Sequence, residues 1–309
     1  ELAPPELIPF ATRIYNIETG AFLDYGPKHV FLNRFPYDYK PDAPALPIVD
    51  ETLEAITCGD AEVKQLLMEA IGNCFFLLNQ FRGAVMLYGS GNNGKSTLLN
   101  MITQLLGKEN ASHLSLQDLA ERFRLMEIYG KAANIGDDIP GTYIPDSSWF
   151  KKAVTGEYLT AEKKGQDPIS FKPFAKMFFA MNALPSVSDK SKGFFSRVLL
   201  VPLNQDFSRL PTRNPGLKDR KWTQEEMEYL TRLAVDGLRK LKAQGDFTRP
   251  QVVQEAVEEY ERENNPVKEF LEEYRESGEA IEDKPTGLIY DSFTFWCQKT
   301  GHKNPMSRR

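Results

Sequence analysis

The spacing of apolar residues along this chain changes several times, and these changes divide it into helix-like and strand-like stretches. Between residues 50 and 80, apolar positions recur three or four residues apart, which predicts two helices. From 84 to about 204, short apolar runs alternate with helical stretches, as in an α/β sheet. After 222 the helical spacing returns. The pattern therefore predicts an α/β core with helices before and after it.

The elements expected inside this pattern can be given as ranges. Buried strands are expected at Ala84–Tyr88, Ala132–Ile135, Met177–Met181 and Val198–Pro202, and helices after Lys95, from Ser115 to Leu125 and around Ser147–Val154. The first 48 residues are rich in proline and aromatic residues and predict short strands around Thr12–Ile17 and His29–Phe35. We therefore expect a domain of strands and helices over 1–80, a core over 81–221 and a helical region over 222–309.

The helical region has clear start and stop signals. Thr223-Gln224-Glu225-Glu226 is a capping box before an amphipathic run, and Pro266 can occupy the first turn of a later helix. A last helix is expected over Thr286–Thr300, ending at Gly301. The residues from Asn304 to Arg309 resemble the beginning of a second, arginine-bearing helix of a helix-turn-helix, although a plain helical hairpin fits the spacing equally well.

Composition narrows the class of protein. The chain has 309 residues, 41% hydrophobic and 26% charged, which is ordinary for a globular protein of about two domains. Its three cysteines form no disulfide or zinc pattern, so we expect a reducing, cytoplasmic location and no membrane segment. The first residue is not Met, so a fragment is expected. A net charge of −5 argues against a protein that coats DNA with its whole surface, but not against a local basic channel.

The strongest motif follows the first core strand. Gly89, Ser90, Gly91, Asn92, Asn93, Gly94, Lys95, Ser96 and Thr97 fit G-x-x-x-x-G-K-[ST], between an apolar strand and a helix. Glycines let the backbone N–H groups approach phosphates, and the helix N-terminus favours negative charge. Lys95 is expected to reach the β- and γ-phosphates, and the Ser96 hydroxyl to hold Mg²⁺. The motif predicts a nucleoside triphosphate site that uses ATP and Mg²⁺.

An acidic pair follows the second expected strand. Asp137 and Asp138 come about 40 residues after Lys95, where Asp137 can hold the Mg²⁺ shell and Asp138 can polarise the attacking water. An ordinary Asp-Asp turn is the alternative, and the position at a strand end favours the functional interpretation.

Three further features are ambiguous by themselves. Asn182 ends an apolar strand, where asparagine is also a common turn residue. Arg197 precedes the last strand, where it could act on a triphosphate or form a surface ion pair. Lys163 and Lys164 lie near the tip of an expected hairpin over 156–171, where they could contact the phosphates of a nucleic acid or simply be solvated.

The order and spacing of these motifs together resemble superfamily 3 helicases, in the branch attached to phage, plasmid and poxvirus primases. The matching segments are Gly89–Thr97 (motif A), Ile135–Asp138 (motif B), Lys151–Lys164 (motif B′), Lys176–Pro185 (motif C) and Gly193–Arg197. The resemblance covers nearly the whole chain. No primase domain is recognisable within it.

The resemblance implies a fold, an activity and partners. It implies an AAA+-type P-loop core, an N-terminal helical domain and a partial winged-helix-like C-terminal region. It implies a homo-hexameric ring that binds ATP between subunits and moves along single-stranded DNA, usually 3′ to 5′, beside a linked or partner primase-polymerase domain. Asn182 becomes a sensor, Arg197 a finger acting in trans, and Lys163 or Lys164 a contact to the strand in the pore.

Two other functions remain open on the sequence. A P-loop small-molecule kinase would need a mobile lid with clustered arginines, and no such segment is evident. A nucleotide-switched ring that binds DNA without unwinding it would keep the P-loop but need no hydrolysis. Hydrolysis stimulated by DNA, without a small-molecule acceptor, separates the helicase from both.

Overall fold

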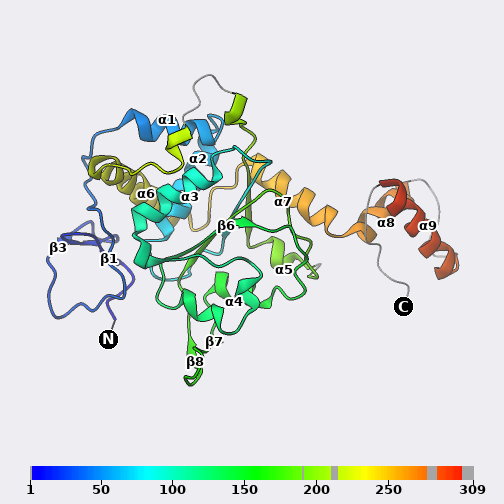
Figure 1. Cartoon of the computed structure of the whole chain (residues 1–309), viewed down its shortest axis with the longest axis horizontal. Coiled ribbons are helices and arrows are strands. Elements are labelled where there is room, and N and C mark those ends of the chain that lie inside the picture. The colour runs from blue at the N-terminus through cyan, green and yellow to red at the C-terminus, as the bar shows by residue number, and fades with distance from the viewer. Residues whose placement is uncertain (1, 190, 210–214, 277–283, 301–309) are drawn as a thin grey trace. The chain divides into compact units, whose positions relative to one another are not determined.

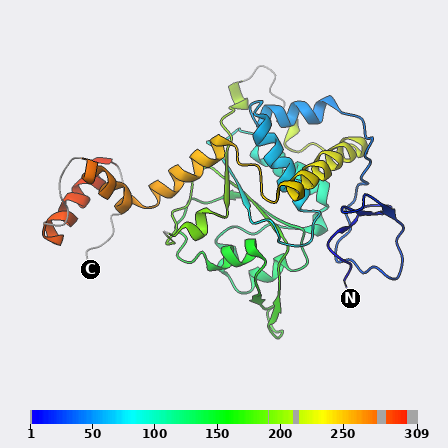
Figure 2. The ribbon, with the colours of Figure 1, turned by 180° about the vertical axis from the view of Figure 1, so that it is seen from behind.

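The computed structural model describes residues 2–189, 191–209, 215–276 and 284–300. The chain divides into two compact units, Glu1–Ala256 and Val257–Arg309. Figures 1 and 2 show the ribbon from opposite sides. The two units are described separately below, and the expected three-part division at 80 and 221 stays a prediction.

The first unit is built on a five-stranded sheet in the order β10-β4-β9-β6-β5. Its strands are β4 (Ala84–Tyr88), β5 (Ala111–Ser112), β6 (Ala133–Ile139), β9 (Lys176–Met181) and β10 (Val198–Pro202), and every neighbouring pair is parallel. The expected strands at 84–88 and 198–202 are confirmed. The short edge strand β5 was not predicted, because two residues give no periodic signal.

Helices and smaller strands surround this sheet. The helices are α1 (Pro47–Ile56), α2 (Ala61–Asn73), α3 (Lys95–Leu106), α4 (Ser148–Thr155), α5 (Lys192–Phe195) and α6 (Gln224–Gln244). The division between the two units falls within α7 (Gln251–Glu263). Two further sheets are β1 (Leu7–Pro9), β2 (Ile14–Asn16) and β3 (Phe22–Leu23), and the hairpin of β7 (Leu159–Ala161) and β8 (Ile169–Phe171). The capping box expected at Thr223 forms, with its side chain accepting from the Glu226 amide.

Two expectations about local structure are wrong. Residues 115–125 form two short 3₁₀ turns, Asp118–Ala120 and Arg124–Ile128, not one helix. The Ser115 and Asp118 side chains accept bonds from each other's backbone N–H groups, as in a capping box, but the backbone becomes extended at Glu121 and ends the first turn there. The stretch 29–35 forms no strand, and only Val30 makes an isolated bridge, to Leu2.

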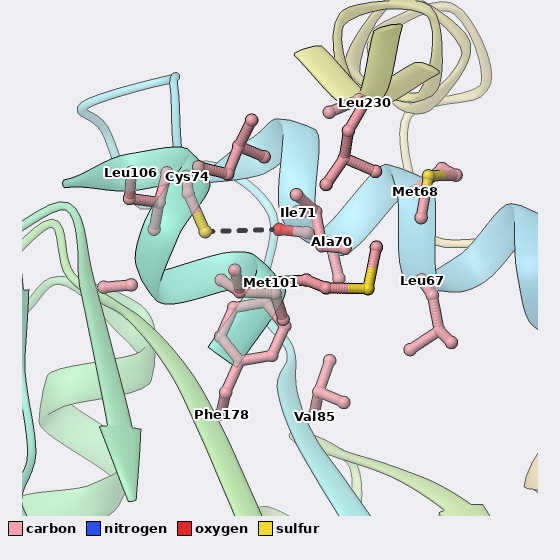
Figure 3. Packing of buried hydrophobic residues seen from close by; sticks show 14 of the residues in the cluster. Leu67, Met68, Ala70, Ile71, Cys74, Val85, Met101, Leu106, Phe178 and Leu230 are labelled. Atoms are coloured by element: carbon pink, nitrogen blue, oxygen red, sulfur yellow. Dashed lines mark hydrogen bonds between the residues drawn. The ribbon is translucent and has the colours of Figure 1, made fainter. Parts of the chain in front are cut away.

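The N-terminal strands share the hydrophobic core of the sheet and helices. The rings of Phe10 and Phe35 pack edge-on against Phe75, just after α2, with centroids 5.3 and 4.8 Å away. One cluster of buried residues continues from there through α2, α3 and α6 to the sheet residues Val85 and Phe178 (Figure 3). These segments therefore stabilise one another through a common core.

Helices α2 and α6 cross at two glycines. A Cβ on Gly72 would lie 1.9 Å from the Ala234 carbonyl oxygen, and one on Gly237 would lie 2.5 Å from the Met68 carbonyl. Real side chains never come so close to backbone. The absence of side chains at both positions therefore allows the two helix backbones to touch.

A buried lysine connects the start of β9 to the turn after α2. The Lys176 ammonium donates to the carbonyls of Phe76, Leu78 and Phe174 and to Asn79 Oδ1, at 2.7 to 3.3 Å. Burial lowers the pKa of Lys176 to about 7, and the neighbouring Cys74 opposes that change. The lysine supplies hydrogen-bond donors to carbonyls of this turn that would otherwise be buried without a partner.

The second unit contains α8 (Pro266–Glu276) and α9 (Thr286–Thr300), as predicted. Phe270 of α8 packs with Phe293 and Cys297 of α9, so the last helix has an apolar packing face. The expected helix-turn-helix continuation from Asn304 to Arg309 lies outside the described residues. Across the described ranges of both units, the helices are too short or too polar for a membrane span.

Candidate functional site

A cavity of about 740 Å³ lies at the carboxyl ends of the central strands. Parallel strands all end at one edge of their sheet, and ligands of such sheets bind there. Most of the polar lining comes from the P-loop, the end of β6 and the residue after β9: Gly91, Asn92, Asn93, Gly94, Lys95, Ser96, Thr97, Asp137, Asp138 and Asn182. Glu51 and Thr52 of α1 and Lys218 add to it. The structure thus brings most of the predicted site residues into one cavity.

The P-loop backbone needs its glycines and one asparagine. Gly91, Asn92 and Gly94 have φ angles of 112°, 52° and 83°, in the left-handed region that glycine and asparagine tolerate best. A Cβ on Gly89 would lie 2.5 Å from the Leu203 carbonyl oxygen. The loop therefore turns sharply from β4 into α3 and places the start of that helix on the cavity wall.

Inside the loop, the Lys95 ammonium is held by its own chain. It donates to the Gly89 carbonyl at 2.6 Å and to Asn93 Oδ1 at 3.2 Å, and only 8% of the residue is exposed. Burial lowers its pKa, and the charges of Asp137 and Asp138 oppose that change. The two carboxylates thus act electrostatically on the lysine across the cavity.

Asn93 organises the loop and connects it to the chain after β10. Its Oδ1 accepts from the Gly91 N–H at 2.6 Å, while its Nδ2 donates to the Gln205 carbonyl at 3.0 Å. The Phe207 N–H in turn donates to the Asn92 carbonyl at 2.9 Å. The P-loop and residues 205–207 therefore form one hydrogen-bonded assembly.

The acidic pair lies on an interrupted strand. Successive side chains of a regular strand point to opposite faces, so two adjacent carboxylates could not face one cavity. Strand β6 has a register shift between Gly136 and Ile139, and Asp138 has a φ of 51°. The bulge redirects the pair, and both side chains line the cavity. The strand continues to Ile139 rather than ending at Ile135, which corrects the predicted boundary.

Asn182 follows the strand that lies between β4 and β6. Met181 is paired with Tyr88 on one side and with Ile139 on the other. The next residue, Asn182, therefore reaches the cavity between the P-loop and the acidic pair. Its predicted role as a sensor of the γ-phosphate stays a prediction that this position permits.

The donor set suits Mg²⁺ bound together with a triphosphate. Ser96 and Asp137 line the same cavity, and Mg²⁺ usually takes only one or two protein oxygens besides phosphates and water. Within the described ranges, no three His, Cys, Asp or Glu side chains gather as an all-protein metal cage. The residues therefore fit a metal that arrives with its nucleotide.

The sequence did not reveal the apolar end of the cavity. Ile48 and Ile56 of α1, Phe207 and Leu217 line it, far apart along the chain. The side chains of Ile56 and Phe207 also lie against Gly94, where a Cβ would be 2.8 and 3.1 Å from them. No motif in the sequence marks any of these four residues as part of a site.

Arg197, Lys163 and Lys164 do not line this cavity. Arg197 lies before β10 and donates through a terminal nitrogen to the Gly193 carbonyl. Lys163 and Lys164 are exposed in the turn between β7 and β8, as predicted, where the hairpin projects from the body of the unit (Figure 1). If these residues act on nucleotide or nucleic acid, they do so away from their own chain's cavity.

Two family descriptions match parts of the chain. "Family of unknown function (DUF5906)" covers residues 87–197, and "Poxvirus D5 protein-like" covers residues 262–309. Similar curated proteins include "Putative helicase L207/L206" of Acanthamoeba polyphaga mimivirus, 24% identical over 217 residues, and "Putative helicase 121R" of Invertebrate iridescent virus 3, 26% identical over 159 residues. These alignments cover 65% and 48% of this chain but only 22% and 17% of the relatives.

Solved structures of the NrS-1 C-terminal region share the fold. One aligns with a TM-score of 0.57 and 16% identity, covering 94% of this chain and 69% of that one. Another structure, of residues 305–718 of that protein, aligns with a TM-score of 0.52 and 14% identity and covers 70% of this chain and 56% of that one. With the family matches and the viral relatives, this likeness confirms the resemblance to primase-linked domains of the superfamily 3 type.

Proposed function

We propose that this domain of the superfamily 3 type hydrolyses ATP to move along single-stranded DNA and unwind a duplex, as the helicase part of a viral or plasmid primase-helicase. The observation that carries the proposal is the convergence of Lys95, Asp137, Asp138 and Asn182 on one cavity. A P-loop alone fits kinases and switches as well. The acidic pair beside it supplies a group for water activation, which a motor needs.

Each cavity residue has a distinct role in this proposal. The P-loop N–H groups and Lys95 bind the phosphates, while Ser96 and Asp137 hold Mg²⁺, which offsets phosphate charge when bound. Asp138 accepts a proton from the attacking water, and Asn182 orients that water against the terminal phosphate. The adenine base of the nucleotide lies at the apolar end of the cavity, against Ile56 and Phe207. The placement of β9 between β4 and β6 supports an AAA+-type core.

We further propose that the working form is a homo-hexamer, with a partial winged-helix-like region after the core and movement from 3′ to 5′. In such a ring Arg197 completes the neighbour's site, and Lys163 and Lys164 line the pore. Arg197 lies away from its own cavity, which supports action in trans. A central pore needs only a few lysines per subunit, so the negative net charge is compatible with DNA binding.

Mixing subunits tests the position of Arg197. When Arg197→Ala protein is mixed with wild type, we expect ATPase activity to fall faster than the fraction of variant, because each variant disables a neighbour's site and stalls the ring. Activity is measured across mixing ratios after subunit exchange, with Arg197→Lys as the variant that keeps the charge. A loss strictly proportional to the variant fraction would contradict action in trans.

The proposed pore contact is tested by salt dependence. For the double variant Lys163→Ala/Lys164→Ala, we expect weaker binding to single-stranded DNA and a salt slope, log Kd against log salt, reduced by about 1.4. The reason is that each phosphate contact to a single strand releases about 0.7 counterion, and the double variant loses two such contacts. Fluorescence anisotropy at several salt concentrations measures it. The control Lys28→Ala/Lys240→Ala removes the same charge from exposed positions elsewhere. An unchanged slope in the hairpin variant rejects the pore contact.

A further inference from the structure

We propose that the outward face of the β7–β8 hairpin is a track for one single strand of nucleic acid, in which the Tyr158 ring stacks on a base. This inference rests on the proposed helicase function and adds to it a contact that the lysines at the tip cannot make. Lysines bind phosphates by charge, whereas an aromatic ring binds a base by stacking.

The register of the hairpin creates two different faces. Leu159 pairs with Phe171 and both are buried, while the next pair, Thr160 and Ser170, is exposed. Extending this register places Tyr158 opposite Lys172, on the exposed side. Because side chains alternate along strands, Tyr158, Thr160, Ser170 and Lys172 share one face. The turn at the end of this face carries Lys163 and Lys164.

The side chains on this face are suited to a nucleotide chain. The Lys172 ammonium lies 5.0 Å from the centre of the Tyr158 ring, and the hydroxyls of Thr160 and Ser170 are 2.9 Å apart. Tyr158 is nevertheless 65% exposed, so most of the ring is open to solvent. An aromatic surface beside a cation and two hydroxyls can take a base, while Lys172 and the hydroxyls bind the adjoining phosphates.

Contacts at both ends of the hairpin strands hold this face in place. Arg122 forms a 2.8 Å ion pair with Glu162, and the ring of Tyr129 packs edge-on against Phe171, with centroids 5.1 Å apart. The ion pair offsets the charge of Glu162, whereas Glu157 accepts a bond from the neutral Thr155 hydroxyl and keeps its charge. The hairpin region therefore carries Glu157 and Asp167 against three lysines, Lys163, Lys164 and Lys172.

The track predicts a component of binding that salt does not weaken. We expect Tyr158→Ala to weaken binding of an oligothymidylate about tenfold at every salt concentration, with an unchanged salt slope. Tyr158→Trp keeps an aromatic face and should retain wild-type affinity. The control Tyr143→Ala removes another tyrosine that is 56% exposed, and we expect it to bind normally.

An abasic deoxyribose-phosphate strand of the same length separates stacking from charge. Wild type should bind this strand about tenfold more weakly than oligothymidylate, and Tyr158→Ala should lower that affinity no further. An equal loss on both strands, or no loss on either, overturns the stacking role. If Lys163→Ala/Lys164→Ala loses affinity while Tyr158→Ala does not, only the track is rejected. If neither variant loses affinity, the proposed nucleic-acid function of the hairpin is rejected as well.

Discussion

Replacing Lys95 with alanine is expected to reduce ATP hydrolysis by about 1,000-fold, because it removes the P-loop ammonium that would contact the transferring phosphate. Asp138→Asn should lower turnover by at least about 100-fold while leaving nucleotide binding largely intact, since an amide cannot accept the proton of the attacking water. Steady-state phosphate release, with and without single-stranded DNA, measures both effects.

The matched control for these variants is Lys108→Ala. Lys108 is exposed beyond the far end of α3 and does not line the cavity, so hydrolysis should be unchanged. Nucleotide binding separates the two expected defects, because Lys95→Ala should lose affinity for ATP and Asp138→Asn should not. Full turnover in either site variant would overturn the proposed mechanism at that residue.

The second large effect concerns stability and arises where α2 crosses α6. Gly72→Ala should lower the free energy of unfolding by about 3 kcal/mol, because its Cβ would overlap the Ala234 carbonyl and force the helices apart. Gly237→Ala should behave similarly against the Met68 carbonyl. Urea unfolding followed by circular dichroism measures both changes.

Gly26→Ala is the matched control for the crossing. Gly26 has no atom within 4 Å of an added Cβ and no positive φ, so we expect a change within about 0.5 kcal/mol. The paired variants separate the helix crossing from the general effect of replacing a glycine in this chain. Stability equal to wild type in Gly72→Ala would show that the helices can separate without cost.

The sequence predicted the elements whose periodicity is long or whose ends carry side-chain signals. The strand Ala84–Tyr88 and the helix Thr286–Thr300 agree with the structure to the residue. The segment 115–125 was expected to be a helix because of its apolar spacing, but the backbone is extended at Glu121 and separates two short turns. Periodicity reports burial and cannot report such a local break.

The candidate site was predictable only where it follows a motif. The P-loop and the acidic pair were found because phosphate and metal chemistry requires particular residues in a particular order. The bulge that turns Asp137 and Asp138 toward the same cavity depends on strand register, which a short apolar run does not encode. The apolar end, with Ile56 and Phe207, depends on tertiary packing between segments about 150 residues apart in the sequence.

The bond between Lys95 and the Gly89 carbonyl has a consequence for product release. Any phosphate that recruits this ammonium competes with an acceptor already 2.6 Å away within the same loop. A triphosphate can overcome this competition because it also gains backbone N–H bonds and contacts for its base. A lone inorganic phosphate gains much less, so under the proposed function the carbonyl would recapture the lysine after the terminal phosphate is cut. The loop would then carry a competitor that helps to clear the site for the next nucleotide.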